Sequence, residues 1–322
     1  MADQNSSHDR QSPQPDLSLW QIFLIFLRLG LTSFGGPVAH ISYFREEFVT
    51  RRQWLSDATY GDLVALCQFV PGPASSQVGM GIGMSLGGFG GAFVAWLGFT
   101  MPSAIVLAVL GLVFAAGNGG GLVATGPMIW GLKLVAVGVV AHALLGMARS
   151  LCPDMPRAIL AITAAALMIA FNGVGMQAVV IVGGLIAGLL FLRRDVAMVE
   201  GRLAAGISPR GAIAALGVFA GFYRSGALVF GGGHVVLPLL QEAVVAPGWV
   251  DSDVFLAGYG ATQAVPGPIF TFAAYLGAVM QNGVGGIVGG ISGAIVALIA
   301  IFLPAFLLVI GLLPFWDRIR HV

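Results

Sequence analysis

The chain has 322 residues, of which 57% are hydrophobic and 9% are charged, whereas soluble domains carry about 25% charged residues. This composition excludes an ordinary soluble protein and predicts an integral membrane protein. Lys and Arg together number 15 and Asp and Glu number 14, so the net charge of +1 is too small to attract nucleic acid. The two cysteines, Cys67 and Cys152, indicate neither a disulfide framework nor a metal cluster, and no cofactor is expected.

Residues 17–192 are predicted to form a first repeat built of membrane helices. They follow a polar tail, residues 1–16, that lacks the features of a signal peptide and is expected to be disordered. The apolar stretch 17–36 is long enough to cross about 30 Å of hydrocarbon before two glycines and a proline break it. Residues 40–55 are amphipathic and are expected at the membrane interface.

Two short apolar segments come next, and their length predicts a hairpin and not two ordinary crossings. Segments 56–70 and 74–86 meet at Pro71-Gly72-Pro73, which we name the first turn. Short segments joined by such a break are typical of a re-entrant hairpin or a discontinuous helix. Further spans are predicted at 91–116, 122–148, 156–171 and 174–192.

A linker with four arginines, residues 193–210, separates the first repeat from a second repeat, residues 211–322. The predicted segments of the second repeat are 211–232, a broken segment to 246, 254–265, 269–280 and an apolar run to 315. Its hairpin contains Pro266-Gly267-Pro268, which we name the second turn. No counterpart of 122–192 follows, so this repeat is predicted to be shortened, either as a natural form or by truncation.

Two motifs occur once in each half of the chain. Phe34-Gly35-Gly36 follows Arg28 by six residues, and Phe230-Gly231-Gly232, continued by Gly233 and His234, follows Arg224 by the same six. Gln68 precedes the first turn and Gln263 precedes the second turn at the same spacing. The separation between the copies changes by a single residue from one motif to the other, which indicates that a whole unit was duplicated.

With these motifs in this order, and with Gly258-Tyr-Gly-Ala-Thr-Gln263 ahead of the second turn, the sequence resembles the chromate ion transporter family of bacterial membrane proteins. The resemblance extends from about Leu17 to Pro304. It implies a multi-pass protein of the bacterial cytoplasmic membrane that exports chromate and confers chromate resistance. It also makes sulfate the natural structural analogue of the substrate.

Arg28 and Arg224 lie inside apolar segments, where a charge is costly unless it serves a function. One alternative is that each side chain extends to the membrane surface. Because the two arginines occupy equivalent positions, we favour a binding site in which both converge on an anion near the midplane. The planar guanidinium matches a tetrahedral oxyanion with two parallel hydrogen bonds, which a lysine cannot offer. The adjacent Phe-Gly-Gly motifs are included in this predicted site.

Each turn is predicted to present the start of a helix to the substrate. Proline is favoured at the first helical position, so Pro73 and Pro268 would begin helices whose free N–H groups and positive dipole ends bind an anion. Glycine lets a ligand approach the backbone. The alternative is that the turns are only packed kinks. The candidate ligands here are Gln68, Pro71, Gly72, Pro73, Ser75, Ser76, Gln263, Pro266, Gly267, Pro268 and Thr271.

Asp62, His40 and His234 are candidates for proton coupling, since histidine titrates near neutral pH. The two histidines are not repeat equivalents, and satisfied interface histidines are the favoured alternative. Lys133 is a further charge within an apolar segment. The glycine-rich stretch 79–91 has no preceding strand and no following Lys-Ser or Lys-Thr, so it predicts helix packing and not an ATP site. Transport is therefore expected to be secondary.

Equivalent loops of the two halves differ in charge. The loop after the first broken segment holds Arg45, Arg51 and Arg52, whereas the region from 238 to Asp253 holds acidic residues and no basic one. Cytoplasmic loops are enriched in Lys and Arg. The two loops are therefore predicted on opposite sides of the membrane, which makes the repeats inverted about a pseudo-two-fold axis in the membrane plane.

The favoured interpretation is an all-α, polytopic, inverted-repeat secondary transporter that carries a small oxyanion, chromate by resemblance. Its expected partners are the anion, the lipid bilayer and a second copy of the chain in a homodimer, and no nucleic acid. Two alternatives stay open: uptake of sulfate or another anion, and a non-transporting scaffold subunit that binds partner proteins through its glycine-rich faces. An enzyme is not expected, because no constellation of nucleophile, base and metal ligands is visible.

Overall fold

The structure is a computed structural model that describes residues 17–116, 154–170, 214–229, 236–280 and 286–319, with a few single positions between 131 and 184. Within these ranges the regular structure is helical and contains no strand, as expected for an all-α membrane protein. The chain forms two compact units, residues 138–211 and residues 1–137 with 212–322. The smaller unit contains α6 (Met155–Ala170), and all other described helices belong to the larger unit.

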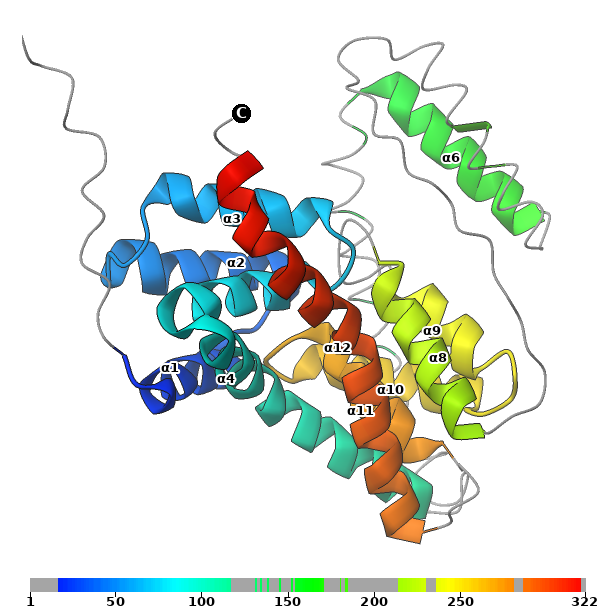
Figure 1. Ribbon diagram of the computed structural model, residues 1–322. Coiled ribbons are helices and arrows are strands. Elements are labelled where there is room, and N and C mark those ends of the chain that lie inside the picture. The colour runs from blue at the N-terminus through cyan, green and yellow to red at the C-terminus, as the bar shows by residue number, and fades with distance from the viewer. Residues whose placement is uncertain are drawn as a thin grey trace, which may run out of the picture. The chain divides into compact units, whose positions relative to one another are not determined.

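The elements of the first repeat in the larger unit follow one another in the blue to cyan part of Figure 1. Helix α1 (Leu19–Thr32) and helix α2 (Gly36–Arg45) are separated by residues 33–35, which we name the first break. Helix α2 continues into a π-helical turn, η1 (Glu46–Arg51), and α3 (Asp57–Phe69) leads through the first turn into α4 (Ala74–Ala116). Gly87 and Gly88 leave the helical conformation and divide α4 into a short and a long part.

The main helices of the second repeat follow the same order. Helix α8 (Ala214–Ala227) and helix α9 (Val236–Val244) are separated by residues 228–235, which we name the second break and of which 228–229 are described. Helix α10 (Ser252–Ala264) leads through the second turn into η3 (Ile269–Thr271), α11 (Phe272–Val279) and then α12 (Gly286–Ile319). Helix α12 corresponds to the long part of α4, with Pro304 aligned on Pro102.

Local sequence signals account for where the helices begin. Ser18 caps α1 in a capping box with Gln21, and Ser56 caps α3 by accepting from the backbone N–H of Thr59. Asp251 caps α10 by accepting from the N–H of Asp253. In the first break Gly35 has φ +99°, a left-handed conformation that glycine adopts without steric cost. Local sequence therefore determines where these helices begin and where the first break occurs.

Glycines allow the first helix of each repeat to pack at backbone distance on a long helix of the same repeat. A Cβ atom at Gly30 of α1 would lie 2.6 Å from the Phe99 carbonyl oxygen of α4. Its equivalent, Gly226 of α8, is in the same close contact with the Ile301 carbonyl oxygen of α12. The two repeats therefore reproduce the same interface, the small-residue type by which membrane helices approach one another.

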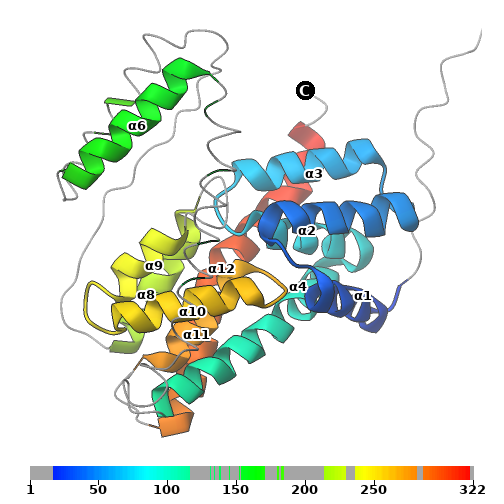
Figure 2. The ribbon, with the colours of Figure 1, turned by 180° about the vertical axis from the view of Figure 1, so that it is seen from behind.

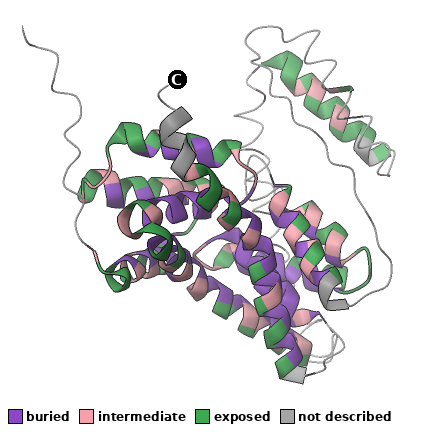
Figure 3. Ribbon diagram, viewed as in Figure 1, coloured by how far each residue is buried: buried purple, intermediate pink, exposed green. Residues whose placement is uncertain are grey.

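Helices α4, α11 and α12 form the centre of the larger unit, and α1 and α8 lie on either side of α4 and α12 in both views (Figure 1, Figure 2). Figure 3 shows the buried residues gathered where α11 and α12 meet. Residues Phe272 to Ala278 of α11 are all buried, so this short helix has no outward face. A helix that is apolar on every side belongs in the interior of a helical assembly.

Two helices in the described part of the chain are long and apolar enough to cross a membrane, Ala74–Ala116 and Val288–Leu313. Shorter apolar helices occur at Leu19–Thr32, Met155–Leu167 and Ile269–Val279. Along α12 a row of large apolar side chains is exposed, including Ile291, Ile295 and Ile299. Apolar rows of this kind are compatible with lipid chains and would be unfavourable in water.

Three predicted boundaries are corrected by the structure. The first helix ends at Thr32 and not at Gly36, so it spans about 21 Å and cannot cross the hydrocarbon alone. Its repeat counterpart likewise ends at Ala227 and not at Gly232. The helix predicted over 40–55 already begins at Gly36. The predicted hairpin segments match α3 and the short part of α4, whereas spans 122–148 and 174–192 and the linker fall largely or wholly outside the described residues.

Candidate functional site

One hydrogen bond connects each turn to the break of the other repeat. The backbone N–H of Gly72 in the first turn donates to the carbonyl oxygen of Val229 in the second break at 2.8 Å. The N–H of Gly267 in the second turn donates to the carbonyl of Ser33 in the first break at 3.0 Å. Ser33 and Val229 each precede the phenylalanine of a Phe-Gly-Gly motif. Reciprocal contacts between equivalent positions are what a two-fold relation between the repeats produces.

The glycine of each turn is required by its backbone conformation and by its surroundings. Gly72 has φ +126° and Gly267 has φ +114°, which side-chain-bearing residues rarely adopt. A Cβ atom at Gly267 would lie 2.6 Å from the Ser103 hydroxyl of α4, and one at Gly72 would lie 2.8 Å from Gln77 Nε2, with the Ala305 methyl of α12 in ordinary contact at 3.5 Å. Ser103 and Ala305 are repeat equivalents, so each turn packs on the long helix of the opposite repeat.

The prolines of the turns cap their helices and do not occupy the first helical position, which corrects the prediction from sequence. Pro73 accepts the first helical hydrogen bond of α4, from Gln77 N–H at 2.9 Å. Pro268 is the cap of η3 and accepts from Thr271 N–H at 3.0 Å. The Thr271 hydroxyl also donates to the Pro268 carbonyl, at 2.7 Å, so its proton is already engaged. The helix starts are present as predicted, one residue later.

Buried polar side chains gather beside the first turn. Ser75 and Ser76 at the N-terminus of α4 are buried, and the Ser75 hydroxyl lies 3.4 Å from His40 Nδ1 of α2. The ring of His40 packs edge-on against Phe99 of α4, with centroids 5.1 Å apart. In the described part of the chain the buried side-chain atoms without a hydrogen-bond partner are Ser33 Oγ, His40 Nε2, Ser76 Oγ, Gln77 Oε1, Trp96 Nε1, Thr100 Oγ1 and Gln263 Nε2.

The two arginines are not brought together. Arg28 lies in the C-terminal half of α1 and Arg224 in the last turn of α8, and these helices flank α4 and α12 on different sides (Figure 1, Figure 2). Both side chains are exposed, and neither forms an ion pair with a described residue. Arg224 lines a cavity of about 120 Å³ between α8 and α9, together with Glu242 of α9. A cation near a helix C-terminus is also favoured by the helix dipole.

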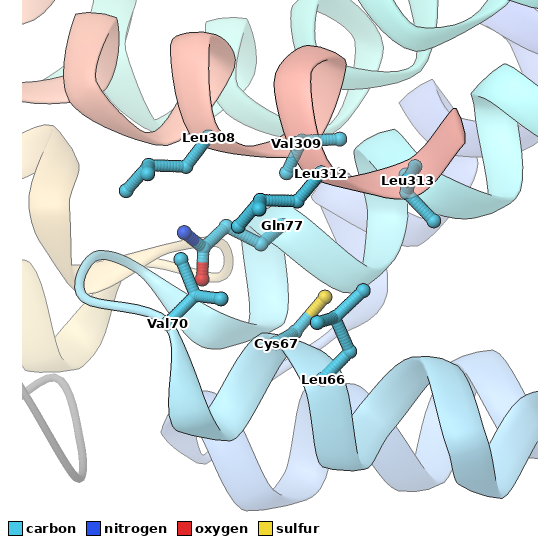
Figure 4. Close-up of a pocket in the computed structure, with 8 residues that line it drawn as sticks. All are labelled: Leu66, Cys67, Val70, Gln77, Leu308, Val309, Leu312 and Leu313. Atoms are coloured by element: carbon cyan, nitrogen blue, oxygen red, sulfur yellow. The ribbon is translucent and has the colours of Figure 1, made fainter. Parts of the chain in front are cut away.

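A second small cavity lies where α3, the start of α4 and α12 meet (Figure 4). Its volume is about 10 Å³, near the smallest that holds one water molecule. The Gln77 amide reaches into it between Val70 and the leucines of α12, and Gln77 Nε2 donates to the Pro71 carbonyl at 2.9 Å. Gln77 therefore braces the first turn from behind, and no duplicated motif points to it because its repeat equivalent is Phe272.

The remaining predicted residues are scattered or outside the described residues. Phe34 is 51% exposed and Gln68 is exposed, whereas Gln263 is half-buried and hydrogen-bonds to Tyr259. Asp62 is half-buried on α3. Phe230, Gly231, Gly232, Gly233, His234 and Lys133 lie outside the described residues. No group of three or more potential metal ligands occurs among the residues that the structure describes.

Comparison with known proteins settles the relationship that the duplicated motifs indicate. The family model described as Chromate transporter matches residues 20–189 and 216–322. The chain belongs to the chromate transporter family. Its membership makes it a membrane transporter, and the matched residues include both turns and both breaks.

Several members of this family resemble the chain over nearly its full length. A chromate transport protein of Pseudomonas aeruginosa is 28% identical over 96% of this chain and 75% of its own length. A chromate transport protein of Cupriavidus metallidurans is 27% identical over 94% of this chain and 76% of its own length. An uncharacterised transporter of Methanocaldococcus jannaschii is 26% identical over 98% of this chain and 81% of its own length. No solved structure matches the chain at a significant level.

Proposed function

We propose that the protein exports chromate from the cytoplasm as a secondary transporter of the bacterial cytoplasmic membrane, and that it thereby confers chromate resistance. The anion binds where the two turns meet the two breaks. Family membership and the relatives that are named chromate transport proteins support the substrate. The observation that carries the location is the pair of hydrogen bonds from Gly72 to Val229 and from Gly267 to Ser33.

Inverted topology is part of this proposal. The reciprocal hydrogen bonds and the matched packing of Gly30 and Gly226 are consistent with a pseudo-two-fold axis. The charge difference between the loops at Arg51 and Asp251 supports an axis that lies in the membrane plane. Binding sites at the interface of inverted repeats, built from helix breaks, are the common arrangement in secondary transporters.

Arg28 and Arg224 act as anion ligands at successive points of the transport cycle. Because α1 and α8 lie on different sides of α4 and α12, the two guanidiniums do not hold the anion together but meet it one after the other. Glu242 lines the same cavity as Arg224, so its negative charge offsets part of the positive charge there before the anion arrives. A guanidinium keeps its charge throughout the cycle, so neither site depends on protonation.

The driving force in this proposal is the membrane potential. Moving one charge across 100 mV is worth about 2.3 kcal/mol, so a divalent anion leaving a negative interior gains about 4.6 kcal/mol. That free energy supports a concentration ratio of roughly a thousandfold or more. Such a ratio is sufficient for resistance without a coupled proton.

The experiment is transport of labelled chromate by the purified protein in vesicles with a set membrane potential. The proposal predicts chromate accumulation in the direction in which the potential drives an anion, with competition by sulfate. Control vesicles carry the Arg28→Gln and Arg224→Gln variants, which should insert normally and transport little. Wild-type vesicles that accumulate sulfate but no chromate would replace the substrate, and vesicles that move neither anion would reject the transport function.

A further inference from the structure

Four buried polar atoms of the first repeat have no hydrogen-bond partner among the described residues. They are the hydroxyl oxygens of Ser33, Ser76 and Thr100 and the Nε2 atom of His40. At most 2% of each of these residues is exposed. Leaving a polar group buried and unpaired is unfavourable, so such groups in a native protein require a ligand, a water molecule or a functional reason.

A continuous set of contacts joins the segments that carry these atoms. His40 lies 3.4 Å from Ser75 at the N-terminus of α4, and its ring packs edge-on against Phe99 in the long part of α4. The Ser33 carbonyl accepts from Gly267 N–H at 3.0 Å. Gly267 in turn packs on Ser103, whose hydroxyl donates to the Thr100 carbonyl at 3.1 Å. The first break and the long part of α4 therefore contact the second turn, and His40 of α2 connects the two parts of α4 beside it.

The same place contains unused backbone donors. The first helical hydrogen bond of α4 runs from Gln77 N–H to the Pro73 carbonyl, so the three N–H groups before Gln77 have no helical partner. They lie at the positive end of the helix dipole, which attracts an anion. Ser75 and Ser76 are two of these three residues.

The equivalent positions in the second repeat are closed to an anion. Valine replaces Ser33 at 229 and His40 at 236, and both valines are fully buried. Phe302 stands at the position of Thr100, and Phe270 at that of Ser75. Thr271, the equivalent of Ser76, donates its proton to the Pro268 carbonyl. The backbones repeat, but the polar side chains belong to the first repeat only.

We propose that, where the two turns meet the two breaks, the transported oxyanion is bound by side chains of the first repeat alone, the hydroxyls of Ser33, Ser76 and Thr100 and the imidazole N–H of His40; Arg28 and Arg224 act before and after this step. This assignment rests on the proposed function and deepens it. Chromate and sulfate dianions present only acceptor oxygens, and hydroxyl and imidazole groups supply the matching donors. When Nδ1 of His40 accepts from Ser75, the proton is on Nε2, which then donates to the anion. The anion is therefore off the pseudo-two-fold axis, and His40 is a ligand and not a proton carrier.

The test compares Ser33→Ala and Thr100→Val with a matched control, Thr262→Val, in full-length protein. The Thr262 hydroxyl is buried like that of Thr100 but donates to the Gly258 carbonyl at 2.8 Å. Chromate and sulfate affinities are measured in detergent and transport in vesicles, and thermal unfolding is followed for each variant. Loss of a hydrogen bond to a charged ligand should weaken binding about tenfold or more in the two site variants.

The two site variants and the control variant should differ both in unfolding temperature and in anion affinity. Removing an unpaired hydroxyl should leave the unfolding temperature unchanged or raised, whereas Thr262→Val should lower it and leave anion affinity as in the wild type. Wild-type affinity for both anions in Ser33→Ala and Thr100→Val would overturn the assignment while the transport function stands. If the wild type binds sulfate but not chromate, the same variants decide the assignment with sulfate. A wild type that binds neither anion overturns both.

Discussion

Replacement of Gly267 by alanine probes the contact between the second turn and the first break. The backbone at φ +114° is strained for alanine by about 1–3 kcal/mol, and a new Cβ would lie 2.6 Å from the Ser103 hydroxyl. Loss of the hydrogen bond to Ser33 adds about 1 kcal/mol. The expected destabilisation of Gly267→Ala is therefore roughly 2–4 kcal/mol. The unfolding temperature in detergent should fall by several degrees, and vesicle transport of chromate should fall with it.

Two other glycines provide graded controls for this prediction. Gly36 has φ +76°, but no atom lies within 4 Å of the position that an added methyl group would take, so Gly36→Ala should cost only the backbone strain. Gly61 in α3 has ordinary helical geometry and open space, so Gly61→Ala should stabilise the helix by up to about 1 kcal/mol. From highest to lowest, the order of unfolding temperatures should be Gly61→Ala, Gly36→Ala, Gly267→Ala. A Gly267→Ala protein as stable and as active as the wild type would refute the reasoning.

Three further predictions concern charge. Arg28→Lys and Arg224→Lys should each lower chromate transport although charge is kept, because the forked donor geometry is lost; unchanged chromate resistance in cells that insert the variants normally would contradict this. A cysteine label at Arg51 should react from the cytoplasm and one at Asp251 from outside, and finding both on one face would dispose of the inverted topology. In vesicles held at zero potential with a proton gradient, concentrative transport should stop, and Asp62→Asn should retain potential-driven flux; persistence at zero potential would mean proton coupling.

The helices of the hairpins can be predicted from the sequence because local signals determine them. Short apolar segments and the proline-glycine turns predict segment boundaries close to those of α3 and the short part of α4. The apolar pattern places the end of the first helix four residues too late. The helix ends at Thr32, which leaves the Ser33 carbonyl free to accept the hydrogen bond from the Gly267 N–H. No local sequence pattern indicates a partner so far along the chain.

The candidate site can be predicted only in part, for a related reason. Duplication draws attention to residues that occur in both halves, such as Arg28 and Arg224. The position of a residue along an apolar segment does not show towards which neighbouring helix its side chain points. Ser33 and Thr100 have apolar equivalents, so a search for repeated residues passes over them. Only the structure shows that these two hydroxyl groups are buried and have no hydrogen-bond partner among the described residues.

The crossed hydrogen bonds between turns and breaks also constrain how the chain assembles during synthesis. At about 5–20 residues per second, the Gly72 N–H waits about 10–30 s before Val229 is made. In the membrane arrangement proposed above, an unpaired amide is costly over that interval, so we expect the first hairpin to stay hydrated or shielded until the second half arrives. The backbone of the first turn therefore gains its partner only after the start of the second break has been made.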